Sequence, residues 1–516
     1  MKKISLIVNL LCFSLIGVVI FNPIAISNKI THISNGNTYY VNDDGDEQFN
    51  TIRDALNFAD DYDTIIVYSG FYQENLEISK SITLQGVEEN NEGLPIIDGD
   101  KNDFVIKINA DGVTISNFII QNPAYDTANI IIYSGSNKIL NNQIKCLDKW
   151  ERGDGIHIMP SVNNNIEGNT ISMCYAGVEI LSSHFTVVKS NEILDNYYGV
   201  LISEEDKNPC CDNTIIEDNY IYNNDDGGVV IDCQKTSSNK IIGNTIEYSK
   251  IGINFCYSSY KSENNLIEGN TISKNPIGGV ILNNLVDSTI NNNNITENKN
   301  DREYNGLGLS LKSCNNNTIS DNEIKYHYDI NILLDHSDYN TLKNNILTFK
   351  TAFGIRLQSS IFNDIISNEI IDNNEYGICL EGSSCSNTII ENNISKNSVG
   401  LYSEENCKNN IIYHNNFYSS DFAYTSDFYN AKDKGENIWY SGELKEGNYW
   451  DDWAKNTGFY KIPKTYEIKG GDNVDHYPLD KPYGKSRSHS FNLFKTINFK
   501  TILEKYFPLL QRLFQI

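Results

Sequence analysis

Asp154, His157 and Glu179 are the residues whose types and order best fit acid–base chemistry. His157 and Glu179 take the third position of two similar segments, Gly-Ile-His-Ile and Gly-Val-Glu-Ile, and Asp154 immediately precedes the first. If the two segments lie side by side, a histidine and two carboxylates come within hydrogen-bond reach, as proton transfer to a sugar requires. We therefore treat these three as candidate catalytic residues. The alternative is a solvated polar patch on a strand face.

A metal centre is less well supported by the sequence. Copper sites are built from clusters of His, Cys or Met, whereas the 8 His and 3 Met of this chain are scattered, without a His-x-His or Met-x-x-Met motif. Calcium prefers several oxygen ligands, and no segment has the spacing of a known calcium-binding loop. We predict no metal site and no cofactor, with calcium as the open alternative and copper disfavoured.

The charge and composition of the chain exclude two classes of protein. There are 67 acidic against 41 basic residues, a net charge of −26. A nucleic-acid-binding protein needs a basic surface for phosphate contacts, so we exclude nucleic acid as a partner. With 40% hydrophobic residues, 32 Tyr and 21 Phe, the chain is also too apolar for a disordered acidic protein.

Residues 1–27 predict export. Lys2 and Lys3 precede an apolar run over residues 4–21, which is typical of a secretory signal peptide. Because the run is long and no small-x-small cleavage site follows, an uncleaved N-terminal anchor stays open. In either form the chain is expected to be exported, to the extracellular space, the cell surface or the periplasm.

The far end of the chain, residues 484–516, differs in charge from the rest. It holds six basic residues against Glu504 alone, and its apolar residues recur at spacings of three and four. Such a basic amphipathic segment could contact a membrane surface or a partner. Alternatively, it folds back and covers the open end of the main domain.

The strongest pattern is an Asn-x-Ile motif that recurs about every 25 residues. Gly-led segments with alternating apolar residues, such as Gly252-Ile-Asn-Phe, recur with it, and so does a third short apolar segment before each Asn. Three short strands and three turns per repeat predict one coil of a parallel β-helix, an all-β solenoid, with regular repeats over residues 111–420. The repeated asparagines are Asn117, Asn142, Asn169, Asn191, Asn219, Asn244, Asn270, Asn293, Asn322, Asn344, Asn368, Asn392 and Asn415.

Each repeated residue type has an expected structural role. We expect the asparagines at left-handed corners, with amides bonded to the coils above and below, and the glycines at left-handed corners that open the strands. Isoleucines should fill the interior. The residue two places after each Gly should point outward and form a column along the rod: His157, Glu179, Leu201, Val230, Asn254, Ile281, Ser310, Asn331, Arg356, Cys379 and Tyr402.

Both ends of the repeat region require covering segments. Residues 38–110, with a short amphipathic helix near residues 49–59, should cap the N-terminal end, because an open solenoid edge invites aggregation. Residues 421–483 should close the other end. They contain an aromatic group that is either a carbohydrate-binding platform or part of the cap: Tyr449, Trp450 and Trp453.

The cysteines do not indicate a dense disulfide framework. The chain has 11 Cys, and Cys12 lies in the signal segment. A chain of this length does not depend on disulfides to fold. We expect buried cysteines that pack in the core, with one or two bridges.

The repeats, together with motifs at both ends, resemble the NosD-type right-handed parallel β-helix proteins. These belong to the pectin-lyase-like superfamily and carry carbohydrate-binding/sugar-hydrolase repeats. The similarity begins at Thr51-Ile-Arg-Asp-Ala-Leu and ends with Gly447-Asn-Tyr-Trp-Asp-Asp and Gly470-Gly-Asp-Asn-Val-Asp. It covers about residues 38–483, and it implies the fold far more specifically than the function.

These observations favour an exported cell-surface β-helix protein that binds carbohydrate or forms part of the envelope without catalysis. The expected partner is a polysaccharide or surface glycan. The first alternative is a polysaccharide lyase, epimerase or hydrolase that acts along one face of the rod, so enzymatic activity stays open. The second alternative, implied by the resemblance alone, is a NosD-like copper-delivery accessory protein.

Overall fold

The computed structural model describes residues 36–484, apart from 46, 152, 205–210, 257–259, 300–305, 419–428 and 457–463. The predictions for residues 1–27 and for the basic tail beyond residue 484 lie outside these ranges. The described residues from Asn37 to Gly484 form one compact unit. No helix among the described residues is both long and apolar enough to cross a membrane.

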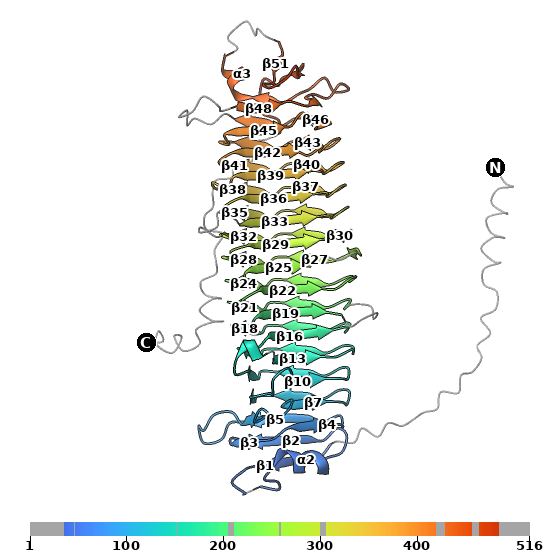
Figure 1. The fold of residues 1–516 in the computed structure, drawn as a ribbon, viewed down its shortest axis with the longest axis vertical. Helices are drawn as coiled ribbons and strands as arrows, with labels where there is room; N and C mark the ends of the chain where they lie inside the picture. Colours follow the sequence, from blue (N-terminus) through green and yellow to red (C-terminus); the bar gives the residue numbers. More distant parts are fainter. Residues whose placement is uncertain are drawn as a thin grey trace, which may run out of the picture. The chain divides into compact units, whose positions relative to one another are not determined.

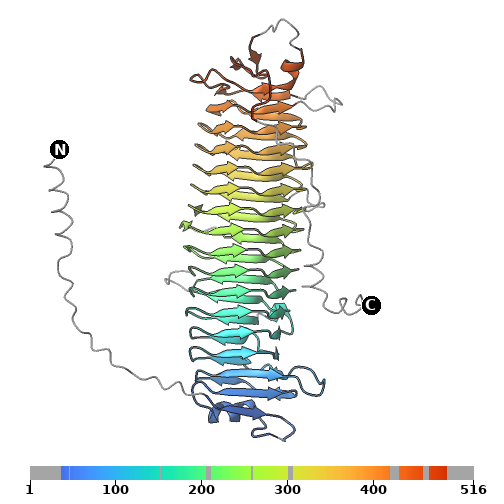
Figure 2. The same ribbon diagram turned by 180° about the vertical axis from the view of Figure 1, so that it is seen from behind.

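Three parallel sheets run the length of a rod and confirm the predicted right-handed parallel β-helix (Figures 1 and 2). Each coil contributes one short strand to each sheet, and every strand pairs with its counterpart in the next coil. Stacked at about 4.8 Å per coil, some sixteen coils span roughly 75 Å.

Sheet A has 17 strands among the described residues. They are β1 (Thr38–Val41), β2 (Thr64–Tyr68), β5 (Thr83–Val87), β8 (Thr114–Ser116), β11 (Lys138–Leu140), β14 (Asn165–Glu167), β17 (Val187–Lys189), β20 (Ile215–Glu217), β23 (Lys240–Ile242), β27 (Leu266–Glu268), β31 (Thr289–Asn291), β34 (Thr318–Ser320), β37 (Thr341–Lys343), β40 (Asp364–Ile366), β43 (Thr388–Ile390), β46 (Lys408–Tyr413) and β49 (Glu436–Ile438).

Sheet B has 16 strands among the described residues. They are β3 (Phe71–Gln73), β6 (Ile96–Asp98), β9 (Ile119–Gln121), β12 (Gln143–Lys145), β15 (Thr170–Ser172), β18 (Glu192–Leu194), β21 (Tyr220–Tyr222), β24 (Thr245–Glu247), β28 (Thr271–Ser273), β32 (Asn294–Thr296), β35 (Glu323–Lys325), β38 (Ile346–Thr348), β41 (Glu369–Ile371), β44 (Asn393–Ser395), β47 (Asn416–Tyr418) and β50 (Tyr449–Trp450).

Sheet C has 15 strands among the described residues and includes the Gly-led segments. They are β4 (Leu76–Ile78), β7 (Ile106–Ile108), β10 (Ala128–Ile132), β13 (Asp154–Ile158), β16 (Ala176–Leu181), β19 (Tyr198–Ser203), β22 (Gly227–Asp232), β25 (Ile251–Phe255), β29 (Gly278–Asn283), β33 (Leu307–Lys312), β36 (Ile330–Asp335), β39 (Phe353–Gln358), β42 (Tyr376–Glu381), β45 (Val399–Ser403) and β48 (Tyr429–Asp433).

The remaining elements are short. The helix α2 (Ile52–Phe58) covers the N-terminal coil, and its cap residue Thr51 accepts a hydrogen bond from the Asp54 backbone N–H. Two minor sheets pair β26 (Ser262–Glu263) with β30 (Leu285–Val286) and β51 (Tyr466–Glu467) with β52 (Val474–Asp475). A 3₁₀ turn, η1 (Lys149–Glu151), precedes β13, and α3 (Asp451–Asn456) follows β50.

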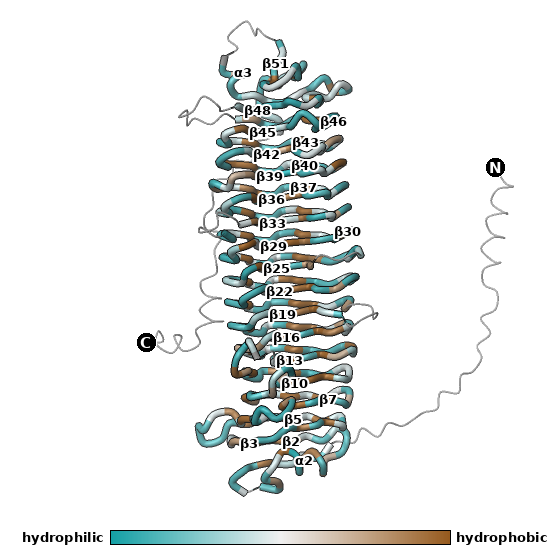
Figure 3. Tube along the Cα trace, viewed as in Figure 1, coloured by the Kyte–Doolittle hydropathy of each residue, from teal (hydrophilic) through white to brown (hydrophobic). Residues whose placement is uncertain are grey.

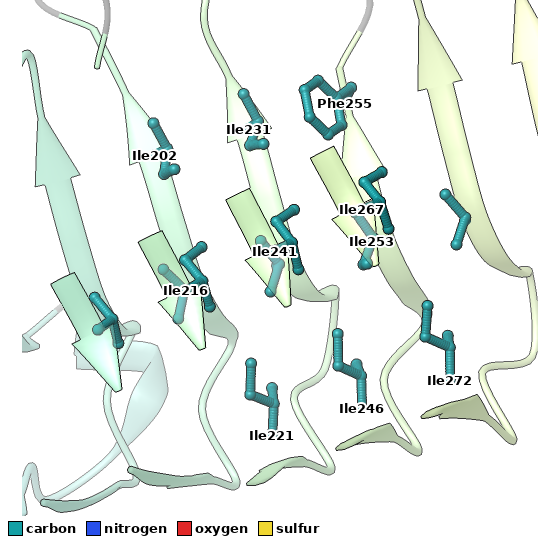
Figure 4. Close-up of a cluster of buried hydrophobic side chains, with 14 of the residues drawn as sticks. Ile202, Ile216, Ile221, Ile231, Ile241, Ile246, Ile253, Phe255, Ile267 and Ile272 are labelled. Atoms are coloured by element: carbon teal, nitrogen blue, oxygen red, sulfur yellow. The ribbon is translucent and has the colours of Figure 1, made fainter. Parts of the chain in front are cut away.

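The core is a column of isoleucines, as the repeat predicts. Ile241 of β23, Ile246 of β24 and Ile253 of β25 come from one coil and are at most 1% exposed. Figure 4 shows such residues stacked on their counterparts in the neighbouring coils. The hydropathy colouring alternates along the strands, with hydrophilic corners between them (Figure 3). Each buried isoleucine contributes about 1.5–3 kcal/mol relative to an exposed one, so the rod is stabilised along its whole length.

The asparagine ladder is confirmed, but its backbone geometry differs from the expectation. In each step the backbone N–H and the side-chain Nδ2 of one Asn donate to Oδ1 of the Asn one coil further on, as Asn244 does to Asn270 at 2.9 and 3.0 Å. The left-handed residue is the one just before the ladder Asn, for example Gly243 or Gly269. Two residues of the predicted series, Asn117 and Asn344, occupy that preceding corner, with φ of 63° and 57°.

The glycines that open the sheet C strands are not left-handed, contrary to the expectation. Positive φ values occur at other glycines, and Gly252 is not among them. A Cβ built on Gly252 would lie 2.5 Å from the Gly279 carbonyl oxygen and 2.5 Å from Cγ2 of Ile272. Glycine is therefore required by the close approach of the next coil, since no side chain fits in that space.

The outward column of sheet C matches the prediction except at one coil. Ser310 pairs with Leu333, and Leu333 with Arg356. Asn331 instead takes the place of the strand-opening glycine, where it is fully buried and its Nδ2 donates to Asn373 Oδ1 at 3.2 Å. This coil has no glycine to mark where the strand begins. The sequence pattern therefore assigned Asn331 to the outward position, which Leu333 occupies two residues later.

The closing segment ends the asparagine ladder on a buried carboxylate. Asp475 Oδ2 accepts hydrogen bonds from the Asn448 backbone N–H at 2.8 Å and from Trp450 Nε1 at 2.9 Å. A second ladder runs from Asn410 to Asn437, whose backbone N–H donates to Asn473 Oδ1 at 3.3 Å and whose Nδ2 donates to Asp433 Oδ1 at 2.9 Å. These donors thereby find partners without a further coil.

The cysteine prediction is confirmed among the described residues. Cys146 and Cys174 form a disulfide between neighbouring coils, and Cys211, Cys314, Cys379 and Cys407 are buried free thiols. The disulfide lies beside the strand that carries Asp154, because Cys174 Sγ would be 3.4 Å from a Cβ on Gly155.

Candidate functional site

The structure brings Asp154, His157 and Glu179 together on the outward face of sheet C. Asp154 begins β13, His157 lies in the same strand, and Glu179 is its register partner in β16. The His157 Nδ1 atom is 2.9 Å from Asp154 Oδ2 and 3.5 Å from Glu179 Oε2. One imidazole nitrogen therefore lies between two carboxylates, as the segment pattern predicts. β13 and β16 lie in the lower half of the rod in Figure 1.

The two carboxylates are held by further hydrogen bonds. Asp154 Oδ1 accepts from the Ala176 backbone N–H at 3.0 Å, and Glu179 Oε1 accepts from Ser203 Oγ at 2.8 Å. The Nε2 atom of His157 is buried and has no hydrogen-bond partner among the described residues. Buried polar atoms normally have partners, so a bound ligand or water is the expected partner of this nitrogen.

A pocket of about 300 Å³ opens at this group. Its lining residues come from three successive coils. Tyr133 at the rim is 48% exposed. The lining residues are Asp126, Thr127, Ile131, Tyr133, Asp154, His157, Met159, Tyr175 and Glu179.

Two groups in the pocket have raised pKa values. Burial raises the pKa of the Asp154 carboxyl from 3.8 to about 7, and the charge of Glu179 adds to this, while the hydrogen bond with His157 acts in the opposite direction. For His157, burial alone would lower the pKa, but the hydrogen bond and charge of Asp154 and the charge of Glu179 outweigh it, so the pKa is raised. Groups with shifted pKa values in a pocket are candidates for function.

These shifts predict that the stability of the protein falls as the pH rises through about 7. Both groups bind protons more tightly in the folded chain. Their contribution is therefore fully present below the unfolded pKa values, and it is lost as the pH rises through the folded ones. Asp154→Asn removes the titrating carboxyl. The Tm of this variant minus that of the wild type should increase between about pH 5 and about pH 8, measured by calorimetry.

Asp126→Asn is the control for this measurement. Asp126 lines the same pocket but is exposed, so the variant corrects for the loss of one negative charge. A Tm difference for Asp154→Asn that stays constant over this pH range, or decreases, would contradict the prediction.

The same three residues offer the closest set of metal donors in the described part of the chain. Asp154, His157 and Glu179 each offer one donor atom, and these three atoms lie within 4.8 Å of one another. One nitrogen and two carboxylate oxygens suit a cation that prefers oxygen ligands, such as calcium. The absence of a metal site and of cofactors stays a prediction.

An aromatic cluster beside the pocket was missed by the sequence analysis. Tyr175, which lines the pocket, stacks on Tyr197 with ring centroids 5.3 Å apart, and Trp150 lies 5.6 Å from Tyr197. Tyr198 packs against both tyrosines. A sequence signal existed, because Tyr175 and the Tyr197-Tyr198 pair each precede a strand-opening glycine in neighbouring repeats. Trp150 gave no signal, since it lies in an irregular turn.

The predicted carbohydrate platform of Tyr449, Trp450 and Trp453 is part of the cap instead. Trp450 is 0% exposed and Trp453 is 8% exposed. The Trp450 ring stacks on Phe417 at 4.5 Å and on Tyr466 at 4.1 Å. With both ring faces covered, Trp450 has no face available to a sugar. The structure therefore favours the capping alternative.

Two family models match the regular coils. One, described as "Periplasmic copper-binding protein (NosD)", matches residues 256–347 and 300–454. The other, described as "Right handed beta helix region", matches residues 104–267. No curated relative matches the chain.

Solved structures of β-helix proteins are similar at low identity. The Dettilon tailspike protein (gp208) is 13% identical over 63% of this chain and 66% of its own, with a TM-score of 0.42. A mannuronic acid specific polysaccharide family 6 lyase from human gut microbiota is 14% identical, covers 65% and 86%, and has a TM-score of 0.47. The periplasmic alginate epimerase AlgG is 13% identical, covers 73% and 77%, and has a TM-score of 0.34. Likenesses at this level say nothing about ligand or activity.

The copper in the description of the first family model does not fit the residues present. The one donor group found in the described residues has a single nitrogen and no sulfur, whereas copper sites use His, Cys or Met clusters. Both ring nitrogens of the buried His327 lie 3.1 Å from backbone carbonyl oxygens, and burial lowers its pKa to about 4. His414 Nε2 pairs with Glu446 at 2.7 Å. We derive no copper chemistry from this site.

Proposed function

We propose that this right-handed parallel β-helix protein, whose coils match the NosD and right-handed β-helix family models, binds a glycan at the pocket around His157. The observation that carries the proposal is the convergence of Asp154, His157 and Glu179 in a pocket with tyrosine walls. Sugar hydroxyls donate to carboxylates, and the apolar faces of sugar rings pack on aromatic rings. The pocket offers both kinds of contact.

The proposed location is outside the cytoplasm, at the cell surface or in the periplasm. The apolar segment with two lysines at the start of the chain supports export. The Cys146–Cys174 disulfide supports an oxidising compartment. A rod with a glycan site on one face would then meet its ligand among the polysaccharides outside the cell, as a binding or envelope component.

A second candidate function, acid–base catalysis on the bound glycan, is favoured by one specific observation. His157 Nδ1 is held by Asp154 at 2.9 Å, and the pKa of Asp154 is raised to about 7 by burial. A buried carboxylate that fixes an imidazole is a common way to orient a group for proton transfer, and such a group accelerates a reaction by about 10²–10⁴-fold. Glycan turnover would establish this function, whereas binding without turnover would leave the first.

The test is the His157→Ala variant of the full chain. We expect it to weaken glycan binding by about tenfold or more, because the Nε2 partner and the fixed positions of both carboxylates are lost together. Titration calorimetry measures the affinity, and mass spectrometry of the same mixtures detects shortened, unsaturated or isomerised sugars.

His336→Ala is the matched control. His336 also pairs with an aspartate, Asp335 at 2.6 Å, but lies many coils away and its side chain is 66% exposed. It should bind like the wild type. Equal affinities of the wild type and His157→Ala would place glycan binding elsewhere on the rod.

A further inference from the structure

Four aromatic side chains form a surface next to the pocket, which we call the aromatic patch: Trp150, Tyr175, Tyr197 and Tyr198. Trp150 is 63% exposed. Tyr175 and Tyr197 stack face to face, with ring planes 4° apart, and Trp150 and Tyr198 pack edge-on against Tyr197. The three tyrosines are half-buried. We take this cluster, with its exposed tryptophan, as a candidate interaction surface.

The turn that carries Trp150 is fixed in place. Lys149 Nζ forms an ion pair with Asp225 Oδ1 at 2.7 Å, which ties η1 to a corner three coils further along the rod. The turn also follows Cys146, whose disulfide with Cys174 joins it to the coil that carries Tyr175. The aromatic patch is therefore preorganised, which lowers the entropy cost of binding a ligand.

The patch and the pocket are continuous. Tyr175 belongs to both, because it lines the pocket and stacks on Tyr197. A sugar chain with one residue in the pocket could therefore place the next on the aromatic rings. This continuity identifies the occupant of the patch as part of the same glycan.

The carboxylates that line the pocket have no Lys or Arg beside them among the described lining residues. These carboxylates are Asp126, Asp154 and Glu179. Lys149, in the turn that carries Trp150, forms an ion pair with Asp225. The whole chain carries a net charge of −26. Carboxylate and sulfate groups are recognised by Arg and Lys, and the described lining of the pocket offers neither.

We propose that the pocket and the aromatic patch bind a glycan that carries no carboxylate or sulfate groups, with one sugar ring stacked on the patch. This inference rests on the proposed function and names its ligand class. Uronate polymers, on which lyases and C5-epimerases act, would find no Lys or Arg for their carboxylates among the described residues that line the pocket.

The ligand class also selects among the reactions open to this site. Elimination and C5 epimerisation both begin with removal of a C5 proton, which an adjacent carboxylate makes acidic, and a glycan without carboxylates lacks that group. Hydrolysis needs no such group: the C1–O bond breaks, water supplies hydroxide to C1, and a proton goes to the leaving oxygen. Any turnover at this site should therefore be hydrolytic.

The experiment compares matched oligosaccharides on the full-length protein. Uncharged oligomers of glucose and of N-acetylglucosamine are titrated beside uronate and sulfated oligomers of equal length, with and without calcium. We expect the uncharged oligomers to bind at least about tenfold more tightly than the acidic ones. Trp150→Ala should weaken this binding about fivefold or more. Phe71→Ala, which removes an exposed ring on β3, should not.

The outcomes distinguish a failure of the inferred ligand class or of the aromatic patch from a failure of the proposed function. Acidic oligomers that bind as tightly as the uncharged ones, or that do so once calcium is added, overturn the inferred ligand class. Wild-type affinity in Trp150→Ala overturns the role of the patch. In both cases the proposed function survives if His157→Ala still weakens binding. If no oligomer of either kind binds, the proposed function and the inference both fail.

Discussion

Replacing Asn270 by leucine should lower the free energy of unfolding by about 4 kcal/mol or more. Asn270 Oδ1 accepts hydrogen bonds from the backbone N–H and Nδ2 of Asn244, and its Nδ2 donates to Ile241 O and Asn293 Oδ1, all within 2.8–3.0 Å. Leucine leaves these buried partners without their hydrogen bonds. Each unsatisfied buried group costs about 1–3 kcal/mol.

Thermal unfolding followed by circular dichroism measures this effect. Asn57→Leu is the matched control, because Asn57 is an exposed residue of α2, and it should change stability by about 0.5 kcal/mol or less. A solenoid can lose coils separately, so limited proteolysis near residue 270 gives an independent readout. Equal stability of the two variants would contradict a stabilising role for the ladder.

Gly252→Ala should destabilise the rod by about 3 kcal/mol or more, although alanine is normally favoured over glycine in a strand. The added methyl group would lie 2.5 Å from the Gly279 carbonyl oxygen and from Cγ2 of Ile272, and 3.1 Å from Nδ2 of Asn275. The Gly279 backbone and the Ile272 side chain cannot both move away from the added methyl group without breaking the contact between two coils. The midpoint of denaturant unfolding measures the loss.

Gly269→Asn is the contrasting variant. Gly269 has a φ of 66°, is exposed, and its added Cβ would meet nothing closer than 4.0 Å. Asparagine already occupies the same corner one coil further on, as Asn292 with a φ of 52°. We expect this variant to keep wild-type stability. The reverse order, with Gly269→Asn the more harmful, would mean that backbone conformation and not contact between coils explains the glycines.

The fold could be predicted from sequence because each sequence repeat corresponds to one coil of the solenoid. One Asn and three inward apolar residues recur in nearly every coil. Each repeat therefore predicts the same three-stranded coil, and the repeats together make the prediction strong. The physical reason for each repeated glycine was harder to infer from the sequence. Gly252 opens a strand and Gly269 precedes a ladder Asn, and the sequence suggested a left-handed corner for the first, yet Gly252 avoids a collision with the next coil and Gly269 adopts the left-handed corner.

The candidate site was predictable only where it follows the repeat. His157 and Glu179 hold the same position in successive strands, and the register pairs them. Trp150 lies in a turn that folds over the rod, and its position depends on an ion pair between residues 76 apart in sequence, Lys149 and Asp225. Contacts of this kind leave no periodic signal. The depth of the pocket likewise depends on side chains from three coils.

The Asn-to-Asn steps of the ladder have a direction, because the backbone N–H and Nδ2 of each Asn donate to Oδ1 of the Asn one coil nearer the C-terminal end, as Asn244 does to Asn270. Donation from Asn448 ends at Asp475, whose carboxylate accepts and has nothing to pass on. Asp475 is 0% exposed, so the ladder ends inside the closing segment and not at a surface. A solenoid whose last donors are satisfied within the same molecule keeps a fixed length, because no open edge remains there for another molecule to extend into a fibre.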